Sequence, residues 1–285
     1  MGNLSSPKLV KEIINKYGFH FNKGLGQNFL IDGNILHQII NASEIDRSTG
    51  VIEIGPGIGV LTQEIAEKAG KVIAIELDSH LIPILKETLS DYDNVKIIND
   101  NALKVDMKRI INDEFKNMQV KVVANLPYYI TTPIVMKLLE DRLNIHSMVI
   151  MVQKEVADRM VAKPGGKNYG ALSVAVQYFT QPRIVTVVQP HSFIPQPKVS
   201  SAVIKLDLLD QPLVKVENEE RFFKVVKAAF GQRRKTLVNA ITNSKDFKIT
   251  KEELKEILIR LSINENQRGE TLSIMQFAAL SDAIF

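Results

Sequence analysis

The sequence predicts an α/β fold with a mainly parallel sheet, followed by a small all-helical carboxyl-terminal domain. Short apolar runs alternate with helical patterns, an arrangement typical of parallel strands joined by right-handed crossovers. The runs lie at about residues 51–54, 72–75, 95–98, 120–124 and 147–152. After Asp207 the pattern changes to a charged linker and helical segments, and 285 residues allow one large and one small domain. We therefore expect one domain over residues 1–206 and a second over residues 207–285.

Helices are expected at both ends of the chain. Pro7 at a first helical position, followed by apolar residues at helical spacing, predicts a short amphipathic helix near the amino terminus. Further helices are expected around residues 222–230 and 236–241, and another begins at Thr250, which forms a capping box with Glu253. The apolar stripe of this last helix, which we assign to the core, consists of Leu254, Ile257, Leu258 and Leu261.

The composition excludes several kinds of site. The chain has no cysteine, so it cannot form a disulfide, a thiolate zinc site or a cysteine nucleophile. None of the five histidines is paired with an acidic residue at metal-ligand spacing, and we predict no metal. No apolar stretch approaches the ~20 residues of a membrane span. We expect a soluble, cytoplasmic protein without a membrane partner.

The loop Asn125-Leu126-Pro127-Tyr128 follows the apolar run that ends at Ala124, and it is the first candidate functional site. Ligands of doubly wound sheets bind at the carboxyl ends of strands. The Asn125 side-chain oxygen and the Leu126 carbonyl could accept hydrogen bonds from the two hydrogens of an adenine amine, while Tyr128 could stack on the base. Such acceptors favour attack of the amine nitrogen on a methyl sulfonium. The alternative is a polar turn that only closes the strand.

A glycine-rich turn follows the first strand. Glycines stand at positions 55, 57 and 59, but the dinucleotide fingerprint needs its third glycine at position 60, where this chain has Val60. The spacing therefore argues against NAD. After the next strand, Glu76 stands where a carboxylate can accept both hydroxyls of a ribose. Gly55, Gly57 and Glu76 together indicate an adenosyl ligand without a pyrophosphate.

With two further segments, these motifs resemble the ribosomal RNA adenine N6-dimethyltransferase family of the KsgA type, over almost the whole chain. The segments are Lys23-Gly24-Leu25-Gly26-Gln27-Asn28-Phe29-Leu30 and Phe193-Ile194-Pro195-Gln196-Pro197-Lys198-Val199-Ser200-Ser201. The resemblance implies a Rossmann-like class I methyltransferase sheet of seven strands, in which strands at about 185–188 and 199–206 close the sheet as an antiparallel hairpin. It also implies S-adenosyl-L-methionine as the cofactor and two methyl transfers to each target base.

The resemblance also implies roles for individual residues. Asn28 and Leu30 would line the methionine end of the cofactor, and Phe193 would face Tyr128 across the extruded adenine. The family usually places an aspartate against the cofactor adenine, whereas this chain has Asn101 before Ala102-Leu103. The Asn101 amide oxygen can still accept from the adenine amine, and Asp100 is the alternative contact.

The implied partner is small-subunit ribosomal RNA in an immature small ribosomal subunit, bound by a monomeric enzyme. The implied targets are adjacent adenines near the 3′ end of that RNA, and the modification would be coupled to small-subunit biogenesis. The net charge of +4 and the run Arg233-Arg234-Lys235 fit a polyanionic partner, and we expect RNA contact by residues 207–285.

Three alternatives stay open at this point. The first is a macrolide-resistance-type methyltransferase of large-subunit RNA. The second is a DNA adenine methyltransferase, although such an enzyme would be expected to carry a larger target-reading region. The third is a catalytically silent RNA-binding assembly factor on the same fold.

Overall fold

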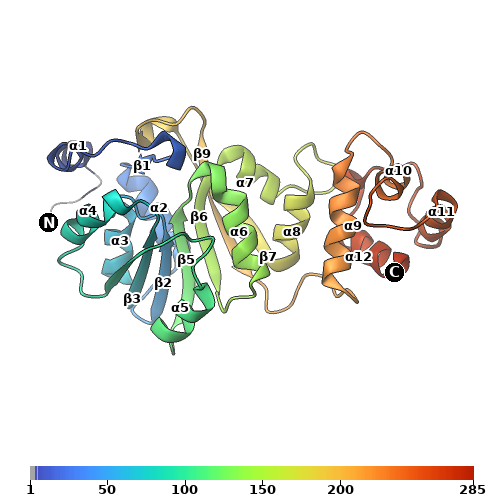
Figure 1. The fold of residues 1–285 in the computed structure, drawn as a ribbon, viewed down its shortest axis with the longest axis horizontal. Helices are drawn as coiled ribbons and strands as arrows, with labels where there is room; N and C mark the ends of the chain where they lie inside the picture. The colour runs from blue at the N-terminus through green and yellow to red at the C-terminus, as the bar shows by residue number, and fades with distance from the viewer. Residues whose placement is uncertain (1–3, 5) are drawn as a thin grey trace. The chain divides into compact units, whose positions relative to one another are not determined.

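The computed structural model describes residue 4 and residues 6–285, apart from the side chain of Lys23. By their contacts, the residues form two units. The first contains the chain up to Ala157 together with Pro182–Leu208, and the second contains Asp158–Gln181 together with Leu209–Phe285 (Figure 1).

A seven-stranded sheet forms the centre of the first unit. Its strands are β2 (Thr49–Ile54), β3 (Lys71–Glu76), β4 (Val95–Asn99), β5 (Gln119–Asn125), β6 (Ser147–Gln153), β7 (Thr180–Val188) and β9 (Ser201–Leu208). They are arranged in the order β4-β3-β2-β5-β6-β9-β7. The first five pair in parallel, and β9 pairs antiparallel to β6. The chain order reverses between β2 and β5, where an open α/β sheet leaves a crevice for a ligand.

The central strands are buried because helices cover both faces of the sheet (Figure 1). Every residue of β2 is buried, and β5 and β6 are buried except at their ends. These sequences are therefore mainly apolar and lack the alternation of a half-exposed strand, and the charged residues Glu53 and Lys121 within them are themselves buried. The helices that begin in this unit are α1 (Pro7–Lys16), α2 (Gly33–Ser43), α3 (Val60–Lys68), α4 (Ile82–Thr88), α5 (Met107–Glu114), α6 (Thr131–Glu140) and α7 (Lys154–Met160).

A second, two-stranded sheet pairs the amino-terminal motif with the Phe193 segment. In this antiparallel sheet β1 (Phe29–Leu30) pairs with β8 (Phe193–Ile194), and Leu30 lies opposite Phe193. Ser192 reinforces the pairing, because its hydroxyl donates to Asp32 Oδ2 over 2.8 Å. Two segments about 160 residues apart in sequence are thereby joined beside the main sheet.

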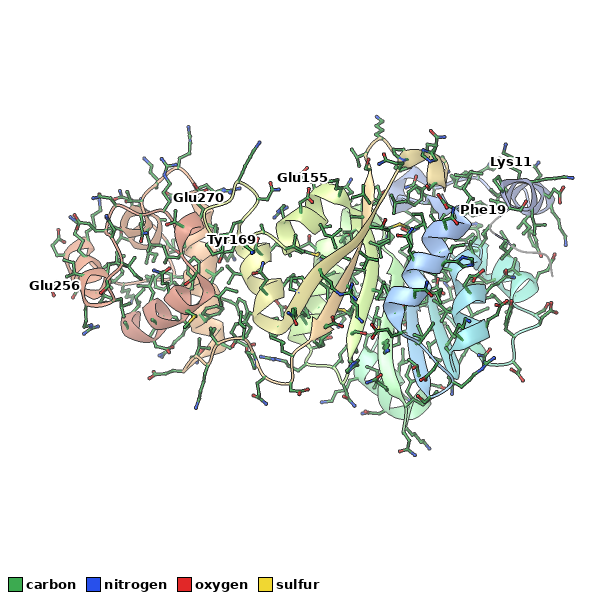
Figure 2. The ribbon with its side chains drawn as sticks, turned by 180° about the vertical axis from the view of Figure 1, so that it is seen from behind. Lys11, Phe19, Glu155, Tyr169, Glu256 and Glu270 are labelled. Atoms are coloured by element: carbon green, nitrogen blue, oxygen red, sulfur yellow. The ribbon has the colours of Figure 1, made fainter. Side chains whose placement is uncertain are left out.

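The second unit is helical apart from the first residues of β7. Its helices are α8 (Ala171–Phe179), α9 (Glu219–Gly231), α10 (Leu237–Thr242), α11 (Lys251–Arg260) and α12 (Ile274–Ile284), and it contains the last turn of α7. Arg233 holds the loop before α8 in place, since it donates to the carbonyls of Lys167 and Tyr169 and lies 3.4 Å from Glu270. The Tyr169 ring packs edge-on against Phe230, and Figure 2 labels both Tyr169 and Glu270.

The predicted α/β fold with seven strands is confirmed, and so is the helical character of the carboxyl-terminal region. The capping box of α11 is also present, because Thr250 N–H donates to Glu253 Oε2 and Glu253 N–H donates to Thr250 Oγ1. Three features were not anticipated: helix α12, the β1–β8 pair, and the grouping of Asp158–Gln181 with the carboxyl-terminal helices. The division of the chain into domains at residue 207 stays a prediction.

Candidate active site

A pocket opens in the first unit at the carboxyl ends of the parallel strands, where the sheet order reverses. It encloses about 1010 Å³ of space, part of it open to solvent. Residues from the loops that follow β2, β3, β4 and β5 line it, and the segment around β1 closes one side. The pocket therefore collects residues that are scattered over the first half of the sequence.

The floor of the pocket is the glycine turn between β2 and α3. Gly55 and Gly57 have φ values of +71° and +62°, in the left-handed region that favours glycine. A Cβ atom added to Gly57 would lie 2.9 Å from a ring carbon of Phe29, so a side chain here would also displace the wall formed by β1. The turn thus leaves bare backbone facing the pocket.

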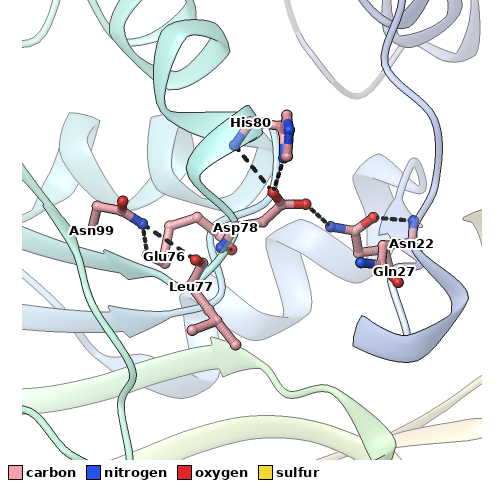
Figure 3. Close-up of polar contacts among 7 residues, drawn as sticks. All are labelled: Asn22, Gln27, Glu76, Leu77, Asp78, His80 and Asn99. Carbon is pink, nitrogen blue, oxygen red and sulfur yellow. Dashed lines mark hydrogen bonds and ion pairs between the residues drawn. The ribbon is translucent and has the colours of Figure 1, made fainter.

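Glu76 lies at the end of β3 (Figure 3). The residue is buried, with an exposed fraction of 6%. Its Oε1 accepts from the Asp78 N–H over 2.8 Å, and its Oε2 accepts from the Gly57 N–H over 3.2 Å. Burial is the main reason why the pKa of Glu76 is raised to about 7, while these hydrogen bonds act in the opposite direction. The pocket therefore presents a carboxyl group whose two oxygens are fixed in direction and retain further acceptor capacity.

Glu53 is a second carboxyl group in the pocket wall, and it is not among the residues predicted for the site. It lies on β2, its side chain is 1% exposed, and its Oε2 has no hydrogen-bond partner among the described residues. Burial raises its pKa to about 8. An acidic residue within a buried apolar strand is unusual, and that was the signal available in the sequence.

These carboxyl groups make the stability of the ligand-free protein depend on pH. Both pKa values are raised above that of an unfolded glutamate, so the folded state binds more protons than the unfolded state. Stability should therefore fall as pH rises from about 5 to about 8.5. Glu53→Gln, which cannot ionise, should gain on the wild type by on the order of 1–3 kcal/mol over that range. Calorimetric melting at several pH values measures the gain.

A matched control for this prediction is Glu256→Gln, at an exposed position in α11 that Figure 2 labels. Its stability relative to the wild type should not change with pH. A difference between Glu53→Gln and the wild type that stays constant from acid to alkaline pH would show that Glu53 ionises as freely in the folded protein as in the unfolded chain.

Asn125 ends β5 at the pocket rim, and its amide has a defined orientation. Its Nδ2 donates to the backbone carbonyl of Asn28 over 3.0 Å. This bond directs the nitrogen toward the β1 segment and leaves Oδ1 as an acceptor. Asn28 is itself held in a tight turn by a bond from its Nδ2 to the Gly26 carbonyl. Both asparagines line the pocket, as does the buried side chain of Leu30.

The aromatic residues are placed differently from the predicted arrangement. Tyr128 lines the pocket, and its hydroxyl lies 2.6 Å from Ser201 Oγ at the start of β9. Phe193 is only 1% exposed and is not among the lining residues, because its pairing with Leu30 places it in the core. Tyr129, which was not predicted as a site residue, lines the pocket and is 51% exposed. In this conformation Tyr128 and Phe193 do not form an open two-walled slot.

Both candidates for the adenine contact of the cofactor lie at the pocket, after β4. Asp100 Oδ1 accepts from the Asn101 N–H, and Asn101 Oδ1 accepts from the Leu103 N–H over 2.9 Å. Each side-chain oxygen atom has a second lone pair that can accept another hydrogen bond. Asn101 and Asp100 therefore both stay candidates.

The part of the chain that the structure describes contains no group of three or more histidine, aspartate or glutamate residues placed to hold a metal ion. None of the helices formed by these residues combines the length and the apolar character needed to cross a membrane.

The sheet is mixed and has seven strands, and its pocket combines a bare glycine turn, a buried carboxyl group after the next strand and an oriented amide at the rim. This combination defines a class I methyltransferase. The model of the ribosomal RNA adenine dimethylase family matches residues 18–280, and the chain belongs to that family. This confirms the resemblance drawn from the motifs. The protein is thus an enzyme, an rRNA adenine N6-methyltransferase, and its cofactor is S-adenosyl-L-methionine.

Individual proteins agree with this assignment. The chain is 55% identical to the ribosomal RNA small subunit methyltransferase A of Alkaliphilus oremlandii, over 99% of this chain and 98% of that protein. A dimethyladenosine transferase from Plasmodium falciparum superposes with a TM-score of 0.74 at 28% identity, covering 88% of this chain and 95% of that one. The 23S rRNA methyltransferase ErmE superposes with a TM-score of 0.68 at 25% identity, covering 90% and 99%.

The pocket fits the cofactor on three structural grounds. The positive φ angles of Gly55 and Gly57 let the turn run along the pocket without side chains, so backbone faces the space that a ligand would occupy. Glu76 offers a carboxyl group at a depth where water is largely excluded. The buried Oε2 of Glu53 lacks a partner among the described residues, and a polar group of a ligand could supply one.

Proposed function

We propose that this enzyme transfers two methyl groups to N6 of each of two adjacent adenines near the 3′ end of small-subunit ribosomal RNA, as a step in small-subunit biogenesis. The orientation of Asn125 carries the chemical part of the proposal, because the bond from its Nδ2 to the Asn28 carbonyl leaves Oδ1 of this pocket-lining residue as an acceptor for an adenine amine. The target is supported by relatives that bear the name small subunit methyltransferase A.

We propose that the cofactor is bound by Glu76, Asn28, Leu30 and the Gly55-to-Gly57 turn. When bound, S-adenosyl-L-methionine supplies an electrophilic methyl group on a positively charged sulfur. The Glu76 carboxylate would accept from the ribose hydroxyls, and Asn28 and Leu30, which line the pocket, would hold the methionine end. The side-chain oxygen of Asn101 or Asp100 would accept from the adenine amine of the cofactor.

Asn125 and Leu126 act on the target base. The lone pair of an adenine N6 is delocalised into the ring, which makes the amine a weak nucleophile. Acceptance of its two hydrogens by Asn125 Oδ1 and the Leu126 carbonyl favours a pyramidal nitrogen whose lone pair is available for attack. As the bond from N6 to the methyl carbon forms, the bond from that carbon to sulfur would break and leave its electron pair on the sulfur. The resulting cationic amine would then lose a proton to water. No side chain is needed as a general base.

Recognition of the base requires that it leave its stack, which costs a few kcal/mol and favours loops and helix ends. Tyr128 is proposed to stack on the extruded adenine. Phe193 keeps its proposed role as the opposite wall only if β8 separates from β1, since its side chain is buried while the two strands are paired.

RNA contact outside the pocket is proposed for the helical domain over residues 207–285. Its basic run Arg233-Arg234-Lys235 is exposed, and Arg233 is also engaged with the loop that ends at Tyr169. The phosphate backbone is the natural partner of such residues. We further propose that the enzyme is a monomer and acts in the cytoplasm, where ribosomal subunits are assembled.

The test is transfer of label from S-adenosyl-L-methionine to unmodified small ribosomal subunits, with large-subunit RNA and DNA in parallel and nucleoside mass spectrometry of the products. Dimethyladenosine confined to small subunits is the expected result. Label on large-subunit RNA alone would assign the enzyme to the macrolide-resistance type. No label despite measured cofactor binding would favour a binding role in assembly.

A further inference from the structure

A chain of hydrogen bonds connects the amino-terminal segment to the carboxyl group of Glu76 (Figure 3). Gln27 Nε2 donates to Asp78 Oδ2 over 2.8 Å, and Gln27 Oε1 accepts from the Asn22 N–H over 2.8 Å. The Asp78 N–H in turn donates to Glu76 Oε1 over 2.8 Å. One amide side chain therefore uses both ends to connect the segment before β1 to the loop after β3.

Asp78, the acceptor in this connection, is oriented by its other hydrogen bonds. Asp78 Oδ1 accepts from both the N–H and the ring Nδ1 of His80, which leaves Oδ2 for Gln27. Burial opposes ionisation of Asp78, but the hydrogen bonds from His80 and Gln27 hold its pKa below the ordinary value. Asp78 is 8% exposed, so its bond to Gln27 is poorly screened by water.

The amino-terminal segment is also hydrogen-bonded to the side-chain amide of Asn125. Asn28, the neighbour of Gln27, accepts from Asn125 Nδ2 through its backbone carbonyl. The 22–28 segment is therefore hydrogen-bonded both to Asp78, whose N–H binds Glu76, and to the side-chain amide of Asn125.

We infer that Gln27 is a positioning residue for the methyl transfer, which locks the amino-terminal segment onto the Asp78 turn and so fixes the ribose carboxylate and the Asn125 amide together. This inference rests on the proposed roles of Glu76 and Asn125. Gln27 itself contacts neither reacting atom in this arrangement. Its contribution lies in holding two loops in register.

The decisive experiment exchanges the polarity of the bond. Gln27→Glu places a carboxylate against Asp78, and Asp78→Asn places an amide donor against the Gln27 donor, so each should weaken cofactor binding about tenfold or more. In the double variant, the amide of Asp78→Asn can donate to the carboxylate of Gln27→Glu, which can still accept from the Asn22 N–H. Cofactor affinity should then return to within about threefold of the wild type.

Affinity is measured by calorimetry with S-adenosyl-L-methionine, and melting temperature is recorded for each variant. The Michaelis constant for the cofactor should rise more than the turnover at saturation falls. Gln119→Glu is the matched control, since Gln119 is exposed at the far end of β5 from Asn125, and its affinity should not change. Gln27→Met removes both hydrogen bonds without adding charge and serves if Gln27→Glu does not fold.

The outcomes separate the two proposals. Weak cofactor binding by each single variant, together with near-normal binding by the double variant, supports the positioning role. Single variants that bind normally, or a double variant that stays weak, overturn it while the function of the site stands, provided that Glu76→Ala binds the cofactor poorly. If Glu76→Ala also binds normally, the proposed ribose contact fails and the inference fails with it.

Discussion

Replacing Asn125 by alanine should reduce methyl transfer by about 10²- to 10³-fold or more, while cofactor binding survives or weakens only slightly. The amide oxygen is proposed to act on the target amine as its nitrogen becomes pyramidal, so its loss removes an interaction made mainly in the transition state. Turnover at saturating cofactor and RNA measures the first effect, and calorimetry with the cofactor alone measures the second.

A second substitution separates the acceptor from its orientation. Asn125→Asp keeps an oxygen for the target amine but loses the Nδ2 donor that now binds the Asn28 carbonyl. We expect its activity to lie between those of the alanine variant and the wild type. Asn41→Ala, at an exposed position in α2, is the matched control and should leave activity unchanged. Near-normal turnover by Asn125→Ala would contradict the mechanism.

The sequence was sufficient for the sheet because its signals are local. A mainly apolar run without alternation, such as the one before Asn125, is typical of a strand that is covered on both faces, and alternating helices leave little freedom of topology. The same locality placed Gly55, Glu76 and Asn125 together, since the carboxyl ends of neighbouring parallel strands share one edge of the sheet.

The features that the sequence did not reveal depend on long-range pairing. Nothing near Phe193 indicates that it pairs with Leu30, about 160 residues earlier, and this pairing buries a ring that was expected to face a base. Likewise, Gln27 is an ordinary polar residue until the fold brings Asp78 within 2.8 Å of it. Glu53 differs, because an acidic residue in a buried strand is visible in the sequence, although its role is not.

Replacing Glu76 by alanine should weaken cofactor binding by about 10²- to 10³-fold, and by more than it slows turnover at saturating cofactor. A carboxylate that accepts from two hydroxyl groups makes two charge-assisted bonds, each contributing about 1.5–3 kcal/mol. Because the ribose is bound equally in the ground and transition states, the loss should appear in the Michaelis constant. Glu252→Ala, on the exposed face of α11, is the control. Unchanged affinity by calorimetry would mean that Glu76 does not hold the ribose.

Glu76 should also make cofactor affinity depend on pH, and the sign follows from its protonation. Burial raises its pKa to about 7, and the ionised form can accept from the two ribose hydroxyls with both oxygens, whereas the protonated form carries a hydrogen on one of them. Affinity should therefore rise as pH increases through about 7 and level off above that value. Glu76→Gln should bind weakly at every pH. Glu53→Gln should retain the transition, because Glu76 keeps its burial and its proposed ribose contact in that variant. A transition that disappears in Glu53→Gln and persists in Glu76→Gln would reverse the assignment of the two carboxyl groups.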